Sequence, residues 1–271
     1  MVKYLRKLLS PLKLKYKEIK YREILNRNRA LKDLYKGKRC FVVGNGSSLK
    51  EMDLRKLKGE FVFTVNDFPL HPDFEYIAPG FYSSIEPIKN LQAFDPKYHY
   101  YPDNYYPFLN ENFKHFPNTK LFFSIESKDY ITKNGLFQNH EVYYLLGTHG
   151  ILADEKKLKD DLSGAISFND GVIYATLCLS CYMGFEQIYF IGCDCDWYIK
   201  KSAVHFFNNI DRVEMAGMNN EEFLYSNFLT LKKWRIITTF FKNKGVNIMN
   251  AGVGGENDTC ERVDFNSLFQ R

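Results

Sequence analysis

A chain of 271 residues, 45% of them hydrophobic, has the size and composition of a globular α/β domain with a lid, or of two small domains. No apolar stretch approaches the roughly 20 residues that cross a bilayer, and the basic start is too short and interrupted in its apolar core for a secretory signal. Residues 1–39 hold 14 Lys and Arg against 3 Asp and Glu, about +11, although the whole chain carries +5. A nucleic-acid-binding protein would spread positive charge over its binding face, so we expect no nucleic-acid partner.

The basic arm, residues 1–37, is expected to be helical. Leu and Ile recur among Lys and Arg from Lys3 to Tyr35, and Pro11 is expected to break the helix into two pieces. One interpretation is an amphipathic helix that contacts an anionic membrane surface through residues 1–36. The other is a solvated helix that packs on the core or on a sister subunit of a homo-oligomer. Residues 38–271 are expected to form the α/β domain.

The six cysteines do not suggest a metal centre. Cys178 and Cys181 have the C-x-x-C spacing, but they lie in an apolar helical pattern with no second pair or nearby histidines. We therefore expect reduced thiols in a cytoplasmic protein.

The first candidate site follows a strand of apolar residues, Cys40 to Val43, which breaks into Gly44-Asn45-Gly46-Ser47-Ser48. The two glycines allow φ > 0 and close approach of a ligand. Ser47 or Ser48 can cap a following helix, so that backbone N–H groups would face an anion such as a phosphate.

A second apolar run, Phe61 to Val65, ends in Asn66-Asp67. Open α/β sheets bind ligands at the carboxyl ends of their strands, so these two strand ends together predict a nucleotide pocket. The alternative is a tight strand-to-helix turn with a good cap.

The remaining pattern predicts one α/β domain with a mostly parallel sheet and helices on both faces. Further strands are expected at 74–82, 121–125, 142–146, 188–191 and 246–249, and helices at 152–162, 172–183 and 223–241.

A second candidate block surrounds the helix at 172–183. Asn169 or Asp170 can cap this helix, which would turn its N-terminus toward the pocket. The strand at 188–191 closes on Gly192-Cys193-Asp194-Cys195-Asp196, and Asp194 with Asp196 forms an Asp-x-Asp that could hold Mg²⁺.

Residues 196–222 lack periodicity and suit a lid over the pocket. This segment contains His205, which could act as a general base. An aromatic-packed histidine is the alternative.

Three short blocks carry a family resemblance. Val43 to Asp53, followed by Val65-Asn66-Asp67-Phe68, resembles the opening of the bacterial sialyltransferases of glycosyltransferase family 42. It is also similar to the MptE-like proteins, which include flagellin-modifying nonulosonate transferases and an archaeal pterin pyrophosphokinase. These families typically read Gly-Asn-Gly-Pro-Ser-Leu, so Ser47 replaces the usual proline. The helix after Asp170-Gly171 with its following strand, and the ending from Asn250 to Gly255, extend the resemblance over about Arg39 to Asp264.

The resemblance implies a Rossmann-like domain of the GT-A-variant type and a CMP-activated donor of a sialic-acid-like sugar. It implies inverting, metal-independent transfer to a surface glycan or glycolipid, as in lipopolysaccharide or capsule biosynthesis, with His205 as base. Asp196 stands where the family usually places a phosphate-contacting tyrosine, a role that Tyr198, Lys200 or Lys201 could take. The implied nucleotide-binding residues are Gly44, Asn45, Gly46, Ser47, Ser48, Asn66, Asp67, Asp170, Gly171 and Asp194.

Other functions are compatible with the same motifs. One is a Mg²⁺-dependent pyrophosphokinase or other phosphotransferase, in which Asp194 and Asp196 would bind the metal. Others are a glycosyltransferase with another nucleotide-sugar and a nucleotide-binding protein without turnover. For the transferase, the basic arm would place the enzyme peripherally on the inner face of the cell membrane.

Overall fold

The computed structural model describes residues 2–85, 102–199, 205–207 and 219–270. Within these residues, eight strands form one parallel sheet in the order β6-β5-β4-β3-β2-β1-β7-β8. This confirms the predicted fold class. The strands are β1 (Arg39–Val43), β2 (Val62–Val65), β3 (Phe81–Ser84), β4 (Lys120–Ser124), β5 (Val142–Gly147), β6 (Ala165–Ile166), β7 (Gln187–Ile191) and β8 (Asn247–Asn250).

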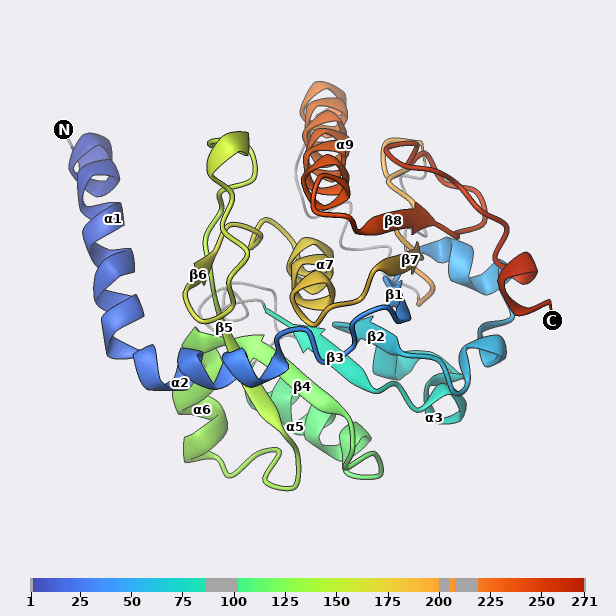
Figure 1. Ribbon diagram of the computed structural model, residues 1–271, viewed down its shortest axis with the longest axis horizontal. Coiled ribbons are helices and arrows are strands. Elements are labelled where there is room, and N and C mark those ends of the chain that lie inside the picture. The colour runs from blue at the N-terminus through green and yellow to red at the C-terminus, as the bar shows by residue number, and fades with distance from the viewer. Residues whose placement is uncertain (1, 86–101, 200–204, 208–218, 271) are drawn as a thin grey trace.

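Helices cover both faces of the sheet, as Figure 1 shows. The α-helices are α1 (Val2–Lys20), α2 (Arg22–Asn26), α3 (Phe74–Ile77), α5 (Pro102–Phe113), α6 (Lys128–Lys133), α7 (Val172–Tyr182) and α9 (Asn220–Lys242). Short 3-10 helices span Arg27–Leu31, Ser47–Glu51, Leu54–Leu57, Phe68–Leu70, Ile125–Ser127, Glu155–Lys157 and Asn266–Phe269.

Two apolar cores lie on opposite faces of the sheet, because successive side chains of a strand point to opposite sides. Val42 of β1 belongs to the core under α7 and α9, which also contains Trp234. Its neighbour Phe41 belongs to the core under α3, α5 and α6, which also contains Tyr106. The central residues of the strands, such as Cys40–Val43 and Ile188–Ile191, are apolar in succession because both faces of the sheet are buried.

The sheet reverses its strand order between β1 and β7. The chain builds β1 to β6 outward in one direction, then returns through α7 to place β7 on the other side of β1. Such a reversal leaves a crevice beyond the carboxyl ends of the two diverging strands, where doubly wound sheets bind ligands.

Three of the predicted elements are wrong. α1 continues through Pro11 to Lys20, and the break falls at Tyr21, where the backbone leaves helical geometry (φ −106°, ψ 14°). Phe74–Ile77 is a helix and not the start of a strand, because Ala78 takes a left-handed conformation (φ 48°) and the chain re-enters the sheet at Phe81. The segment 152–162 contains one 3-10 turn, Glu155–Lys157, and no α-helix.

Candidate functional site

A cavity of about 450 Å³ opens beyond the carboxyl ends of β1, β2 and β7. The N-terminal end of α7 and the inner face of α9 form its other walls. Its position is the point where the strand order reverses. The lining residues are Gly44, Asn45, Gly46, Val65, Asn66, Asp170, Gly171, Val172, Ile173, Tyr174, Gly192, Cys193, Asp194, Cys195, Trp197, His205, Ser226, Asn227, Thr230, Lys233 and Trp234.

The two glycines after β1 allow the turn to lie against the turn after β7. Gly44 N–H donates to the Ile191 carbonyl at 2.9 Å, and Gly46 N–H donates to the Gly192 carbonyl at 2.8 Å. A Cβ on Gly44 would lie 2.3 Å from the Gly192 oxygen. Neither Gly44 nor Gly46 has a positive φ, so the expectation of left-handed backbone here is wrong. The close approach is to the protein's own backbone.

The segment after Gly46 is a 3-10 helix, and neither Ser47 nor Ser48 caps an α-helix there. Ser48 instead binds Asp194: its N–H donates to Oδ2 at 3.0 Å and its hydroxyl to Oδ1 at 2.5 Å. Both residues are buried, and a Cβ on Gly46 would lie 2.6 Å from the same carboxylate. The N–H groups of Gly44, Gly46 and Ser48 therefore already have acceptors within the protein, so they do not form the expected phosphate cradle.

Asn45 lines the cavity and has a buried side-chain amide oxygen. Its Nδ2 donates to the Val65 carbonyl at 3.2 Å, which ties the β1 turn to the end of β2. Its Oδ1 is buried without a hydrogen-bond partner among the described residues. A buried acceptor without a donor costs free energy, so this oxygen is an exception among the buried polar atoms next to the cavity.

Asn66 and Asp67 take different positions at the end of β2. Asn66 lines the cavity in a left-handed conformation (φ 46°), and its carbonyl accepts from the Tyr82 hydroxyl at 2.8 Å. Asp67 is only 5% exposed and lies outside the lining. Burial, and then the charge of Asp67, raises the pKa of Tyr105, so Asp67 belongs to a buried tyrosine cluster beneath the site.

Asp170 does not cap α7. The residue before the helix is Gly171, and no side chain bonds to the first turn. Asp170 Oδ2 accepts from Ile151 N–H at 3.2 Å, while Oδ1 lies 3.4 Å from Lys233 Nζ and 3.9 Å from His149 Nδ1. The expectation that Asn169 or Asp170 caps this helix is wrong, because Asp170 links the start of α7 to neighbouring segments.

The residues that follow β7 divide between the cavity and the interior. Cys195 and Trp197 line the cavity, and Cys195 has a positive φ of 55°. Burial raises the pKa of the Cys195 thiol to about 12, so this cysteine is not a thiolate near neutral pH. Asp196 is 3% exposed and, like Tyr198, lies outside the lining.

His205 enters the cavity through a backbone contact with the β1 turn. It forms an antiparallel bridge with Gly46, and Phe206 N–H donates to the Asn45 carbonyl at 3.0 Å. The His205 ring stacks on Phe207 with centroids 5.2 Å apart. Lys200, Lys201 and most of the expected lid lie outside the described residues.

The structure brings together eight of the residues chosen from the sequence and leaves five outside the cavity lining. The eight are Gly44, Asn45, Gly46, Asn66, Asp170, Gly171, Asp194 and His205; the five are Ser47, Ser48, Asp67, Asp196 and Tyr198. The functional roles of these residues remain predictions.

Sequence reasoning missed the contribution of α9. Ser226, Thr230 and Lys233 are spaced by four and three residues, so they share one face of this helix. They line the cavity together with the buried Asn227. One sequence signal could have revealed it. The polar residues on this face of the helix are followed, toward its C-terminus, by the buried apolar residues Trp234 and Ile237.

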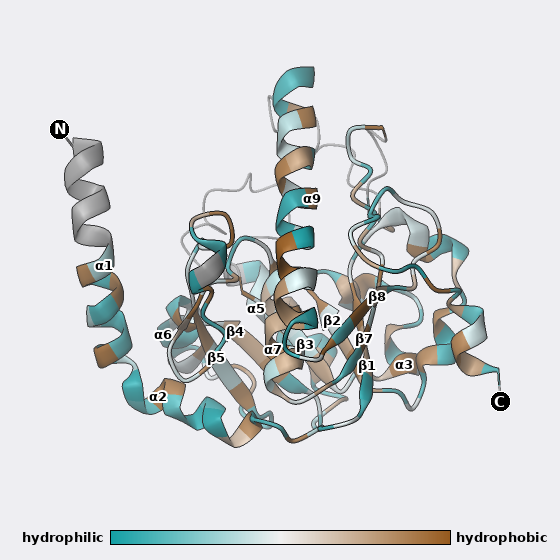
Figure 2. Cartoon of the chain, turned by 45° about the horizontal axis from the view of Figure 1, so that its top comes forward, coloured by the Kyte–Doolittle hydropathy of each residue, from teal (hydrophilic) through white to brown (hydrophobic). Residues whose placement is uncertain are grey.

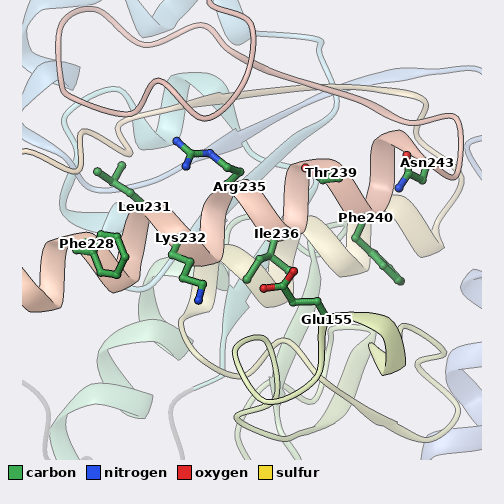
Figure 3. A pocket seen from close by; sticks show the side chains of 9 residues that line it. All are labelled: Glu155, Phe228, Leu231, Lys232, Arg235, Ile236, Thr239, Phe240 and Asn243. Atoms are coloured by element: carbon green, nitrogen blue, oxygen red, sulfur yellow. The ribbon is translucent and has the colours of Figure 1, made fainter.

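A larger hollow of about 700 Å³ runs along the other side of α9. Figure 3 shows its lining, which comes from the helix and from Glu155. No end of a described strand contributes to this hollow, so we place the candidate site at the smaller cavity.

Within the described part of the chain, no group of three or more His, Cys, Asp or Glu residues could hold a metal ion.

No family model and no curated protein matches the sequence. Among solved structures, a MAf glycosyltransferase from Magnetospirillum magneticum AMB-1 is similar at 15% identity and a TM-score of 0.45, over 91% of this chain and 39% of that chain. The sialyltransferase CstII from Campylobacter jejuni, in complex with the substrate analogue cytidine-5'-monophosphate, is similar at 14% identity and a TM-score of 0.44, over 83% of this chain and 87% of that chain. Scores this low do not assign the chain to a family.

Proposed function

We propose that this protein is a glycosyltransferase that moves a sialic-acid-like sugar from a CMP-activated donor to a glycan or glycolipid acceptor, with inversion. The observation that carries the proposal is the cavity at the strand reversal. It gathers residues from two separate sequence blocks that the family resemblance places around a nucleotide: Asn45 and Asn66 from the first block and Asp170 from the second, with their neighbours. A cavity at this position is the usual ligand site of a doubly wound sheet.

In the proposed reaction, His205 takes the proton of the acceptor hydroxyl. The acceptor oxygen forms a bond to the anomeric carbon of the sugar while the bond from that carbon to the phosphate oxygen breaks. The electron pair of the broken bond leaves with CMP. Asn45 Oδ1 would accept a hydrogen bond from a hydroxyl or amino group of the nucleotide, which would give this buried oxygen a partner.

The first experiment is a thermal-shift panel of CMP, CDP, UDP, GDP and ATP, each with and without Mg²⁺. A ligand at about 100 times its Kd that binds only the folded state stabilises it by about 2.7 kcal/mol. We expect stabilisation by CMP that EDTA leaves unchanged, followed by turnover of CMP-sugars with glycan acceptors. A shift that requires Mg²⁺ and occurs only with ATP, UDP or GDP would contradict the proposal.

A Mg²⁺-dependent phosphotransferase remains the second candidate, and we rank it lower on one observation. It would need the Asp194 carboxylate at a metal, but both oxygens of that carboxylate accept hydrogen bonds from Ser48. The expectation that the reaction needs no metal stays a prediction, which the EDTA comparison tests.

We also propose that the enzyme works on the inner face of the cell membrane, where lipid-linked acceptors would be within reach. No helix of the described residues is long and apolar enough to cross a bilayer. The basic arm supports peripheral contact through charge and exposed apolar residues.

A further inference from the structure

We propose that Lys233 of α9 is the phosphate-binding cation of the cavity. The inference rests on the proposed function in one respect, that a nucleotide phosphate enters this cavity. It adds a residue from the last long helix, which none of the sequence motifs contains.

The charge distribution around the cavity points to Lys233. Of the described residues that line it, Lys233 is the sole Lys or Arg, whereas Asp170 and Asp194 are acidic. The Asp194 carboxylate is already bound to Ser48. A phosphate ester that enters the cavity therefore meets one positive side chain there, and that side chain is only 19% exposed. Partial burial strengthens a charge interaction because water screens it less.

The face of α9 around Lys233 has the composition of a binding surface. Ser226, Asn227 and Thr230 precede Lys233 on the cavity side, whereas Trp234 and Ile237 continue the helix into the core. Polar groups turned inward lower stability unless they find partners. These polar residues lie along the cavity and not in the core, which is the placement expected where this half of α9 faces a polar ligand.

The Lys233 ammonium group can bind more than one acceptor. Within the described residues it forms an ion pair with Asp170, with Nζ and Oδ1 3.4 Å apart. An ammonium group carries three N–H donors, so a phosphate could bind while Asp170 still offsets part of the charge. Asp170 is itself held by Ile151 N–H, which keeps the ammonium at the cavity wall.

The turn after β1 supports this role. Three of its N–H groups, those of Gly44, Gly46 and Ser48, donate to Ile191, Gly192 and Asp194 and not to a ligand. A preorganised cation such as Lys233 can stabilise the charge of a leaving phosphate in their place.

The test compares Lys233→Gln with Lys232→Gln, its neighbour on α9, which lines the outer hollow instead (Figure 3). Affinities for CMP, cytidine and inorganic pyrophosphate are measured by calorimetry. We expect Lys233→Gln to weaken CMP binding by at least about tenfold and to leave cytidine binding unchanged, because a charge-assisted hydrogen bond is lost. Lys232→Gln should alter neither, and Lys233→Arg should restore most of the CMP affinity.

Other outcomes separate this inference from the proposed function. Equal CMP affinity in Lys233→Gln and the unchanged protein would overturn it, as would equal losses for CMP and cytidine. If the unchanged protein prefers another nucleotide, and Lys233→Gln weakens that nucleotide but not its nucleoside, Lys233 keeps its role and the CMP donor is wrong. If no nucleotide and no pyrophosphate binds, both proposals fail.

Discussion

His205 reaches the cavity from far along the chain because its backbone pairs with the turn after β1. The bridge to Gly46 and the hydrogen bond from Phe206 N–H to Asn45 fix the backbone, and the stack on Phe207 restricts the ring. An imidazole held in this way is suited to take a proton, but it is equally suited to pack. The two roles can be distinguished by the effect that removing the ring has on the rate of sugar transfer.

We therefore predict that His205→Ala lowers the rate of sugar transfer from a CMP-sugar to a glycan acceptor by about 100-fold or more. General-base catalysis typically contributes about 10²–10⁴ to a rate. Affinity for CMP should change little, because the proton acceptor acts on the other substrate. Initial rates and CMP binding are measured on the same preparations.

The exposed His115 supplies the control, since His115→Ala removes the same ring from a residue outside the cavity lining. Its rate should equal that of the unchanged protein. If transfer by His205→Ala stays within about tenfold of normal, the assignment of His205 as base is wrong, and the ring has a packing role.

At the scale of elements, strands that are buried on both faces are the part of the fold best predicted from sequence. Cys40–Val43 and Ile188–Ile191 are continuous apolar runs, and the residues after each run mark the two sides of the strand reversal. Phe74–Ile77 fails as a prediction because a short apolar run fits either a strand or a helix. Here Phe74 packs against Phe113 at 5.4 Å between ring centroids, a tertiary contact that local sequence does not reveal.

The candidate site also contains residues that the sequence predicts and residues that it does not. The glycine-rich turn and Asn66 can be predicted from the sequence as site residues because they follow recognisable strands. The position of Lys233 at the cavity cannot be predicted in this way. It depends on how α9 packs over the cavity, and the spacing of helix residues does not show which face of the helix meets which pocket. The sequence predicts a helix cap for the serines after Gly46, but Ser48 binds the buried Asp194, which lies 146 residues later in the chain.

The junction between the turns after β1 and β7 gives a second prediction. Ser48→Ala removes the hydroxyl that donates to Oδ1 of the buried Asp194 carboxylate. Because the loss of a buried hydrogen bond to a charged group costs about 1–3 kcal/mol, we expect the free energy of unfolding to fall by about that amount. Urea denaturation monitored by tryptophan fluorescence measures it.

Ser267 provides a matched control, because its hydroxyl also bonds within a Ser–Asp pair, to the Asp264 carbonyl, but on the surface. Ser267→Ala should change stability by less than about 0.5 kcal/mol. Equal effects of the two substitutions would mean that the Ser48–Asp194 contact does not hold the two turns together.

At the scale of the whole molecule, α1 presents two different faces. Leu14 packs on the core, Lys17 Nζ lies 2.6 Å from Glu126 Oε1, and Glu18 Oε1 accepts from Ala165 N–H at 3.1 Å. On the opposite side, spaced by four and three residues, Leu12 and Ile19 with Tyr16 between them are 65–67% exposed. Figures 1 and 2 show the helix extending away from the sheet.

Basic side chains border this exposed stripe. Lys13, Lys15 and Lys20 are exposed on its two flanks. Apolar residues bordered by lysines are typical of helices that lie in the interface of an anionic membrane, where the lysine stems cover apolar surface and the ammonium groups meet lipid phosphates.

We therefore predict that the protein co-sediments with vesicles that contain phosphatidylglycerol and much less with vesicles of phosphatidylcholine alone. The triple substitution Leu12→Ser, Tyr16→Ser and Ile19→Ser should reduce binding by at least about tenfold, since each apolar side chain that leaves the interface loses its burial energy. Replacing Lys13, Lys15 and Lys20 by Gln should remove the preference for anionic lipid, at about 1 kcal/mol for each charge.

A second exposed apolar group on a long helix supplies the control. Leu224, Tyr225 and Phe228 of α9 are 55–62% exposed, and their replacement by Ser should leave vesicle binding unchanged. If that control loses binding and the α1 variant keeps it, the membrane contact lies on α9. If the protein binds neither kind of vesicle, light scattering tests the other interpretation of the arm, that it packs on a sister subunit. A dimer that dissociates when the α1 residues are substituted would place the sister subunit on the exposed stripe. The basic arm would then complete an oligomer, and the proposed location at the membrane would be wrong.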